Sequence, residues 1–226
     1  MAEIKRRAVS PAQKEKRRQD ILNSAKTLFN ATQDYNGLLM KHIAENISLT
    51  KGTLYLYFKT KEEVFLALYT QEFNRVFDHI DVALQTEAGK GSVDKLVTLL
   101  CEQLTTEQTF LRLNSMLHTV LEQNIDFDTA LAFKTLLRDR LLNTGRFLAA
   151  YLPPLSPLNG AEILLSVHEL LIGSYQAAAP TPFLDEIFER EDMRFMKLDF
   201  AVQFPKNLRW LLQSAYAEMS AQVSSS

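Results

Sequence analysis

The sequence predicts an all-α protein. Apolar residues recur at helical spacing along most of the 226 residues, and the alternating pattern of a half-buried strand is rare. With 46% hydrophobic residues and only 7 Gly and 7 Pro, the composition favours a helix-rich globular protein over a disordered chain or a sandwich of short strands. The length allows one large domain or two small ones. From the periodicity we expect about nine helices.

The first 60 residues are expected to form a disordered basic arm followed by a three-helix domain. The arm covers residues 1–13 and the domain covers residues 14–60. Two short helices are expected at residues 40–46 and 51–57. The first helix, residues 14–31, has its apolar residues on one face. These residues are Ile21, Leu22, Ala25, Leu28 and Phe29.

Capping residues indicate where several helices begin. Thr50 can accept a hydrogen bond from the amide of Thr53 at the start of the third helix. The run Thr60-Lys61-Glu62-Glu63 has the pattern of a capping box, which predicts the start of a fourth helix. Asp126 can cap a later helix, and Ser156 followed by proline predicts another.

Residues 61–222 are expected to form a second helical domain. Its helices follow from apolar periodicity, caps and proline breaks, whereas residues 183–203 show no clear pattern. Pro205 is expected to open the last helix, because proline is favoured in the first helical turn. After the helix that begins at Lys61, helices are expected at residues 93–104, 107–123, 127–151, 157–178 and 205–219.

Charge is distributed unevenly along the chain. The first 61 residues contain 12 Lys and Arg but only 5 Asp and Glu, whereas the remainder contains 13 basic and 22 acidic residues. A basic head on an acidic body is expected if only one end of the molecule meets a polyanion.

Cysteine content and hydropathy bear on localisation. Cys101 is the single cysteine and lies in an apolar run, so no internal disulfide can form and a core position is expected. No apolar run reaches the length of a membrane span, and the basic N-terminus lacks the apolar stretch of a secretory signal. We therefore expect a cytoplasmic protein without a membrane partner.

The strongest functional signal lies in residues 40–65. Two short amphipathic helices meeting at a tight joint form a helix-turn-helix pattern, in which the second helix enters the major groove of DNA. Gly52 lacks a Cβ, so the backbone there can approach a phosphate closely, and a helix N-terminus favours an anion. Each tyrosine or lysine alone fits a core or a solvated face, but the set beside a basic segment indicates DNA binding. The expected DNA contacts are Lys41, Thr50, Lys51, Gly52, Thr53, Tyr55, Tyr57 and Lys61.

Residues 17–65 resemble the DNA-binding domain of the TetR (tetracycline repressor) family of bacterial regulators. The resemblance implies a helical dimer with an N-terminal DNA-binding domain and a C-terminal regulatory domain. It also implies binding to an inverted-repeat operator and release by a small ligand. The matching residues are Ile21-Leu22, Ala25, Leu28-Phe29, Ile43-Ala44, Thr50-Lys51-Gly52-Thr53-Leu54-Tyr55, Tyr57-Phe58 and Lys61-Glu62.

Two positions depart from the family pattern. Ser48 stands in the joint where the family usually has glycine, so a serine must tolerate an unfavourable backbone conformation unless the turn differs slightly. Leu39 stands where the family usually has a threonine that caps the second helix and contacts phosphate. Lys41 or the basic arm is expected to supply compensating charge.

No catalytic or metal-binding spacing is present in the C-terminal two-thirds of the sequence. His118 and Glu122 share a helical face, but a metal site needs a third ligand, and no phosphate loop or nucleophile elbow occurs. We therefore expect no enzyme activity, no metal and no cofactor. Apolar faces with scattered polar groups are typical of a ligand pocket and also of an ordinary core. The candidate pocket residues are Phe110, Met116, His118, Leu121, Phe147, His168 and Tyr175.

The expected function is that of a sequence-specific DNA-binding regulator, a repressor released from its operator by a small hydrophobic or amphipathic ligand. The resemblance implies a homodimer through the helices near 157–178 and 205–219, and a two-fold dimer suits two DNA half-sites. The alternative is a DNA-bound scaffold that recruits a protein partner and needs no ligand. The sequence does not specify the effector, the operator, the regulated genes or the choice between repression and activation.

Overall fold

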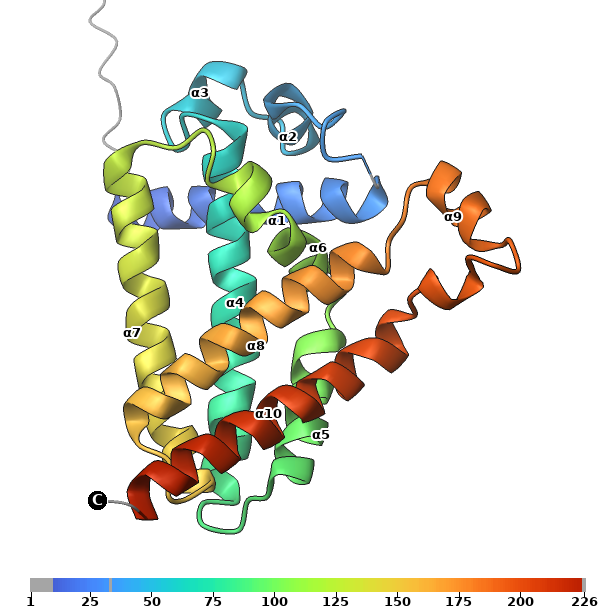
Figure 1. Cartoon of the computed structure of the whole chain (residues 1–226). Coiled ribbons are helices and arrows are strands. Elements are labelled where there is room, and N and C mark those ends of the chain that lie inside the picture. The colour runs from blue at the N-terminus through green and yellow to red at the C-terminus, as the bar shows by residue number, and fades with distance from the viewer. Residues whose placement is uncertain (1–9, 33, 225–226) are drawn as a thin grey trace, which may run out of the picture.

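The computed structural model describes residues 10–32 and 34–224. All regular structure in these residues is helical, which confirms the predicted fold class (Figure 1). α4 (Lys61–Thr86) runs from the N-terminal helices to the opposite end of the molecule, and helices that precede and follow it in the chain pack against it. None of the helices within the described ranges is both long and apolar enough to cross a membrane.

Three helices form the N-terminal part of the molecule, called the reader below. α1 begins at Pro11 because Ser10 accepts a hydrogen bond from the amide of Gln13, and the Gln13 side chain accepts one from the amide of Ser10. The prediction of a disordered arm is therefore wrong for residues 10–13, and its other part, residues 1–9, lies outside the described residues. The reader helices are α1 (Pro11–Ala31), α2 (Met40–Asn46) and α3 (Lys51–Tyr55).

α4 starts where the sequence predicted, although the capping box differs in detail. Thr60 accepts a hydrogen bond from the amide of Glu63 at 3.1 Å. The Glu63 carboxylate accepts its bond from the amide of Lys59, at 2.6 Å, rather than from the amide of Thr60. The carboxylate therefore also holds the last residues of the reader against the start of α4.

The body of the molecule consists of α4 and the helices that follow it. Ten α-helices lie within the described residues, one more than expected, because the segment without a clear pattern contains α9. The remaining helices are α5 (Val93–Thr105), α6 (Gln108–Ser115), α7 (Phe127–Tyr151), α8 (Pro157–Ala177), α9 (Pro182–Phe188) and α10 (Phe200–Ser224).

The predicted helix at residues 107–123 is wrong as a single element. α6 ends before Met116, and a π-helical turn, η1 (Leu117–Leu121), follows it. Here the amide of Leu121 bonds to the carbonyl of Met116 five residues earlier. Apolar residues that recur every four positions lie on one face of an α-helix and also of a π-helix. The apolar pattern therefore could not reveal the change from one to the other.

The last helix also begins earlier than predicted. Pro205 lies inside α10, and Asp199 caps the helix by accepting a hydrogen bond from the amide of Ala201 at 2.8 Å. The rings of Phe200 and Phe204 stack with centroids 5.5 Å apart, and Phe204 is fully buried. Burial of these rings outweighs the hydrogen bond that the proline removes from an early turn.

An arm leaves the body between α8 and α10 (Figure 1). It consists of α9 and a 3₁₀ turn, η2 (Arg194–Met196), neither of which contains a buried residue. Phe195 is the most open of its apolar side chains, at 83% exposed. The arm therefore has no core of its own within one protomer.

α7 and α8 cross where two glycines meet. A Cβ on Gly145 would lie 2.6 Å from the carbonyl oxygen of Pro157, and a Cβ on Gly160 would lie 2.4 Å from the carbonyl oxygen of Gly145. The two backbones are thus in direct contact, closer than helices separated by side chains. This crossing sets the separation of the two helices that border the pocket described below.

Candidate functional site

Ser48 forms the joint between α2 and α3 with a φ of 54°, in the left-handed region. It is the one residue other than glycine with a positive φ among those described. The amide of Leu49 bonds to the carbonyl of Ala44 at 2.8 Å and closes the end of α2. The prediction that serine must tolerate an unfavourable backbone at this position is confirmed.

Replacing Ser48 with glycine is expected to raise the free energy of unfolding by about 1 kcal/mol. The left-handed region costs a residue with a Cβ roughly 1–2 kcal/mol, and the greater freedom of glycine in the unfolded chain offsets part of that gain. Urea denaturation at equal protomer concentration measures the change. Ser48→Ala, which keeps a Cβ, is the control and should not gain stability. Equal stabilities of the two variants would contradict the explanation.

α2 begins without a side-chain cap at Leu39. Nδ1 of His42, the third residue of the helix, accepts a hydrogen bond from the amide of Leu39 at 3.1 Å. One half of a capping box is therefore retained, with an imidazole in the place of Glu or Gln. Sequence reasoning missed this role, because a histidine three residues after a leucine is not a recognised capping pattern.

α3 presents its N-terminal half to solvent. Thr50 accepts from the amide of Thr53 at 3.2 Å, as predicted, and the two hydroxyl oxygens lie 2.8 Å apart. Lys51 and Gly52 are exposed, and a Cβ added to Gly52 would meet nothing within 4 Å. The fold of one protomer therefore does not require glycine at this position.

A further residue joins this outer face. Leu56 is 79% exposed, whereas Leu54 and Phe58 face the core. Leu56 is the C-cap residue of α3, and its spacing of two residues from Leu54 places it opposite Leu54, beside Tyr55. This signal was present in the sequence and was missed. An exposed leucine on a reading helix can contact the methyl group of thymine.

The other predicted DNA contacts lie in different environments. Lys41 is exposed on α2, and Tyr57 is half-buried in the turn that follows α3. The Lys61 ammonium donates to the carbonyl of Tyr35 at 2.9 Å and lies 3.8 Å from the centroid of its ring. Burial lowers the pKa of Lys61. In this conformation Lys61 is thus engaged within the reader.

The segment after η1 touches the exit of the reader. The Thr60 hydroxyl donates to the carbonyl of Asn124 at 3.0 Å, and the Asn124 side chain donates to Glu62 at 3.2 Å. Lys59 pairs with Asp126 at 2.6 Å, an interaction that raises the pKa of Lys59 and lowers that of Asp126. These bonds connect the body to the junction of α3 and α4.

A second connection lies at the end of α1. The Arg112 guanidinium on α6 donates to the carbonyls of Phe29, at 2.9 Å, and Thr32, at 3.1 Å. It therefore satisfies carbonyls that the helix end leaves free. Movement of the segment between α6 and α7 would therefore change the hydrogen bonds that hold the reader at both connections.

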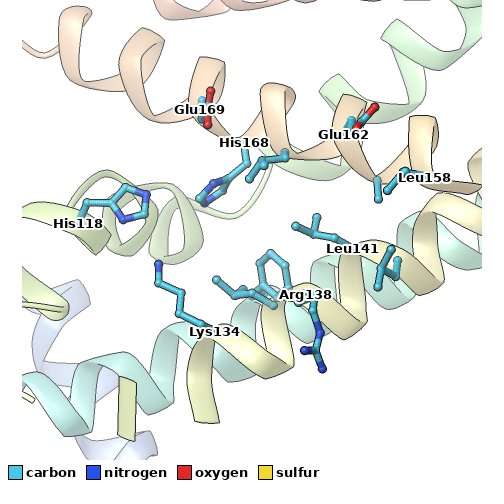
Figure 2. Close-up of a pocket in the computed structure, with 13 residues that line it drawn as sticks. His118, Lys134, Arg138, Leu141, Leu158, Glu162, His168 and Glu169 are labelled. Carbon is cyan, nitrogen blue, oxygen red and sulfur yellow. The ribbon is translucent and has the colours of Figure 1, made fainter. Parts of the chain in front are cut away.

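A pocket of about 420 Å³ lies between α7 and α8 (Figure 2). This volume is within the range of small-molecule sites in proteins. His118 of η1, Lys134 of α7 and His168 of α8 lie at one end of it. The rest of the lining is mainly apolar and includes Phe73, Leu137, Leu141, Leu142, Leu158 and Leu165.

His168 is fixed by a buried polar cluster. Its Nε2 lies 2.8 Å from Oδ1 of Asn114, which also accepts a hydrogen bond from the Tyr69 hydroxyl at 3.0 Å. Because an amide oxygen can only accept, Nε2 of His168 carries the proton. The pKa of His168 is lowered to about 4, mainly by burial and secondly by the nearby His118. The imidazole is therefore neutral at neutral pH. The ring is thus held in one tautomer at the pocket wall.

The pocket contains two of the seven residues proposed from the sequence. His118 and His168 meet there, with ring centroids 6.0 Å apart. Phe110 and Leu121 are fully buried core residues, and Tyr175 packs edge-on against Phe200. Met116 and Phe147 are partly buried against the same core and do not line this pocket. Lys134, which the sequence reasoning missed, lines it instead.

Two family models match the chain over most of its length. One, for bacterial regulatory proteins of the tetR family, matches residues 21–68. The other, for the tetracyclin repressor-like C-terminal domain, matches residues 70–217. Together they include both the helix-turn-helix and the pocket.

A curated relative is the uncharacterized HTH-type transcriptional regulator YuxN of Bacillus subtilis (strain 168). It is 27% identical over 92 residues, which are 40% of this chain and 31% of the relative. The match thus spans about a third of the relative's length.

Solved structures share the fold. One is a possible TetR family transcriptional regulator from Streptomyces coelicolor A3(2), with a TM-score of 0.58 and 21% identity, over 88% of this chain and 98% of that one. Another is the fatty acid degradation regulator FadR from Bacillus halodurans, with a TM-score of 0.52 and 21% identity, over 87% and 94% of the two chains. The reader, the helical body and the match of the C-terminal model over more than half of the sequence lead to one conclusion: the chain belongs to the TetR family of bacterial transcriptional regulators.

Proposed function

We propose that this regulator is a cytoplasmic, dimeric repressor that binds an inverted-repeat operator and is released by a small apolar or amphipathic ligand. The observation that carries the DNA-binding role is the open N-terminal face of α3, where a Cβ on Gly52 would meet nothing within 4 Å. We propose that residues 14–60 bind the operator DNA, and that residues 61–222 bind the ligand and form the dimer.

The proposed contacts follow the geometry of the reading helix. The N-terminus of α3 faces a phosphate, since its free amides and its dipole favour an anion. Lys51 and Tyr55 bind the backbone on either side, and Thr53 contacts a base edge. Lys41, Thr50, Tyr57 and Lys61 complete the proposed set, with Lys61 leaving the Tyr35 carbonyl when it meets a phosphate.

Lysine substitutions are expected to separate phosphate contacts from structural roles. Lys51→Ala and Lys61→Ala should each weaken binding to every duplex and reduce the salt dependence of the binding constant by about one phosphate per subunit. Fluorescence anisotropy over a range of salt concentrations measures the slope. Lys61 also holds Tyr35, so an unchanged slope together with a lower melting temperature would limit Lys61 to a structural role.

The proposed dimer face consists of α8 and α10, which pack side by side (Figure 1). Trp210 on α10 is 57% exposed, and Ile172 on α8 is half-buried. Gly173, on the same helix, has open space where a Cβ would be and so permits close approach of a partner helix. A two-fold pairing of this face would give two readers for two half-sites.

Trp210→Glu is expected to convert the dimer into a monomer, because the substitution would bury a charge without a partner in the interface. Analytical ultracentrifugation at fixed protomer concentration measures the change. Leu131→Glu places the same charge on an exposed leucine of α7 and serves as the control. A dimer that persists in Trp210→Glu would contradict the proposed face.

A scaffold that recruits a protein partner is the second candidate function. The exposed phenylalanines of the arm between α8 and α10 would suit the surface of such a partner. A thermal-shift screen against apolar and amphipathic compounds separates the two functions. Stabilisation by a compound that also releases DNA supports the ligand-released repressor. Absence of any such compound, with a specific protein captured by the DNA-bound form, supports the scaffold.

A further inference from the structure

Three polar side chains from separate elements point toward one another at one end of the pocket. They are His118 from η1, Lys134 from α7 and His168 from α8 (Figure 2). The acidic lining residues Glu162 and Glu169 lie on the outer side of α8 and are directed away from this space (Figure 2). Arg138 also lines the pocket, but its guanidinium is directed away from this space and pairs with Asp139 at 2.7 Å (Figure 2). An occupant would therefore meet the Lys134 ammonium and two imidazoles at one end and a mainly apolar wall over the rest.

The Lys134 ammonium forms an ion pair with the carboxylate of Glu122, which lies outside the pocket lining. Glu122 Oε1 is 2.7 Å from Nζ of Lys134, and Glu122 Oε2 is 3.1 Å from Nδ1 of His118. The Glu122 side chain is only 18% exposed and does not line the pocket, whereas Lys134 is 51% exposed and does. An anion entering the pocket would meet the ammonium first and would compete with Glu122 for it.

Building on the ligand-released repressor proposed above, we infer that this pocket binds an anionic amphiphile whose carboxylate takes the place of Glu122 on Lys134. The apolar body of the ligand lies against leucines of α7 and α8, including Leu137, Leu141 and Leu165. Exchange of one carboxylate for another keeps Lys134 paired, so the ligand's charge is compensated in the pocket. The displaced Glu122 loses its cation, and this cost opposes binding. A neutral ligand would leave the Lys134–Glu122 pair intact.

Displacement of Glu122 would act on the reader through the chain itself. The amide of Glu122 closes the π-helical turn onto the carbonyl of Leu117, at 3.1 Å. Two residues later, the carbonyl of Asn124 accepts the hydrogen bond from Thr60 at the start of α4. A shift of this short segment therefore alters the support of the α3–α4 junction, and π-helical turns are frequently found at functional sites. A ligand favours the released state to the extent that it binds that state more tightly.

Three ligands with the same chain and different head groups test the inference. Isothermal titration with decanoate, decanol and decyltrimethylammonium, each below its micellar concentration, is expected to show specific binding of decanoate. Lys134→Met should weaken decanoate binding roughly tenfold, as expected for loss of one charge-assisted hydrogen bond. Glu122→Gln should strengthen it by roughly the same factor, because the head group no longer competes with a charged carboxylate. Lys90→Met, on an exposed loop outside the pocket, is the control.

The opposite responses of the two variants distinguish ligand competition from a purely structural role. A structural pair would give weaker binding in both variants, which would overturn the inference. Tighter binding of decyltrimethylammonium than of decanoate, or equal binding of decanol, would overturn it as well. DNA binding and its release by a wider set of compounds are measured on the same protein samples. Release by a cationic or neutral compound would leave the proposed repressor function standing and reject only the anionic ligand.

Discussion

Gly52→Glu is expected to weaken operator binding severely without unfolding the protein. A Cβ at this position meets nothing within 4 Å of the protomer, so the fold can accept a side chain. On DNA, the added carboxylate would stand between the N-terminus of α3 and a phosphate. With about 1–3 kcal/mol lost in each subunit, the dimer loses about 2–6 kcal/mol, so its operator affinity should fall by roughly 30-fold to 20,000-fold. Anisotropy titration with an operator duplex measures the affinity, and thermal unfolding measures the stability.

Two control variants make this result specific. Gly52→Ala adds only a methyl group and should weaken binding less than Gly52→Glu. Ala88→Glu makes the same change in charge on an exposed loop of the body and should leave operator affinity close to that of the wild type. Unchanged affinity in Gly52→Glu would mean that α3 does not face DNA as proposed.

Gly145→Ala is expected to have the largest effect on stability, lowering the free energy of unfolding by about 2–3 kcal/mol. The new methyl group would lie 2.6 Å from the carbonyl oxygen of Pro157 and 2.7 Å from the nitrogen of Ala161. Both atoms belong to the backbone, so they cannot move aside as a flexible side chain can. α7 and α8 would have to separate, and the pocket between them would change shape. Urea denaturation at equal protomer concentration measures the loss.

Gly52, measured without DNA, provides a matched control in a helix outside the proposed dimer face. A Cβ there meets nothing within 4 Å, so Gly52→Ala should be neutral or should raise stability by up to about 1 kcal/mol, because alanine favours a helix. Similar stabilities of Gly145→Ala and Gly52→Ala would show that the helix crossing can relax and does not fix the pocket wall.

Local hydrogen bonding explains why several helix starts could be predicted from the sequence. Asp126 accepts from the amide of Thr129 at 2.8 Å, and Ser156 accepts from the amide of Asn159 at 3.1 Å, as the capping pattern implied. Such bonds join residues that are near one another in the chain. The prediction that Pro205 opens the last helix is wrong, because the start of α10 depends on Phe200 and Phe204 packing into the core. Such packing is a tertiary effect.

The candidate sites differ in how far they could be predicted. The helix-turn-helix pattern is confined to a short segment, so residues such as Gly52 could be assigned to one face without knowledge of the rest of the fold. The pocket is assembled from side chains of α4, η1, α7 and α8, and only the packing of these elements brings Phe73, His118, Lys134 and His168 to one space. Phe110 and Leu121 were placed in it because apolar periodicity does not distinguish a core from a pocket, and Lys134 was missed because a lysine in a helix usually faces solvent.

Selection of genomic DNA fragments by the wild-type protein and by Gly52→Glu, in parallel and at equal salt, tests the central claim most directly. The source organism's DNA is fragmented, incubated with each protein, recovered and sequenced. The proposed function predicts that the wild type enriches a small set of fragments sharing an inverted repeat and that Gly52→Glu enriches none of them. Enrichment of the same fragments by both proteins, or of none by the wild type, would contradict the claim that α3 reads an operator.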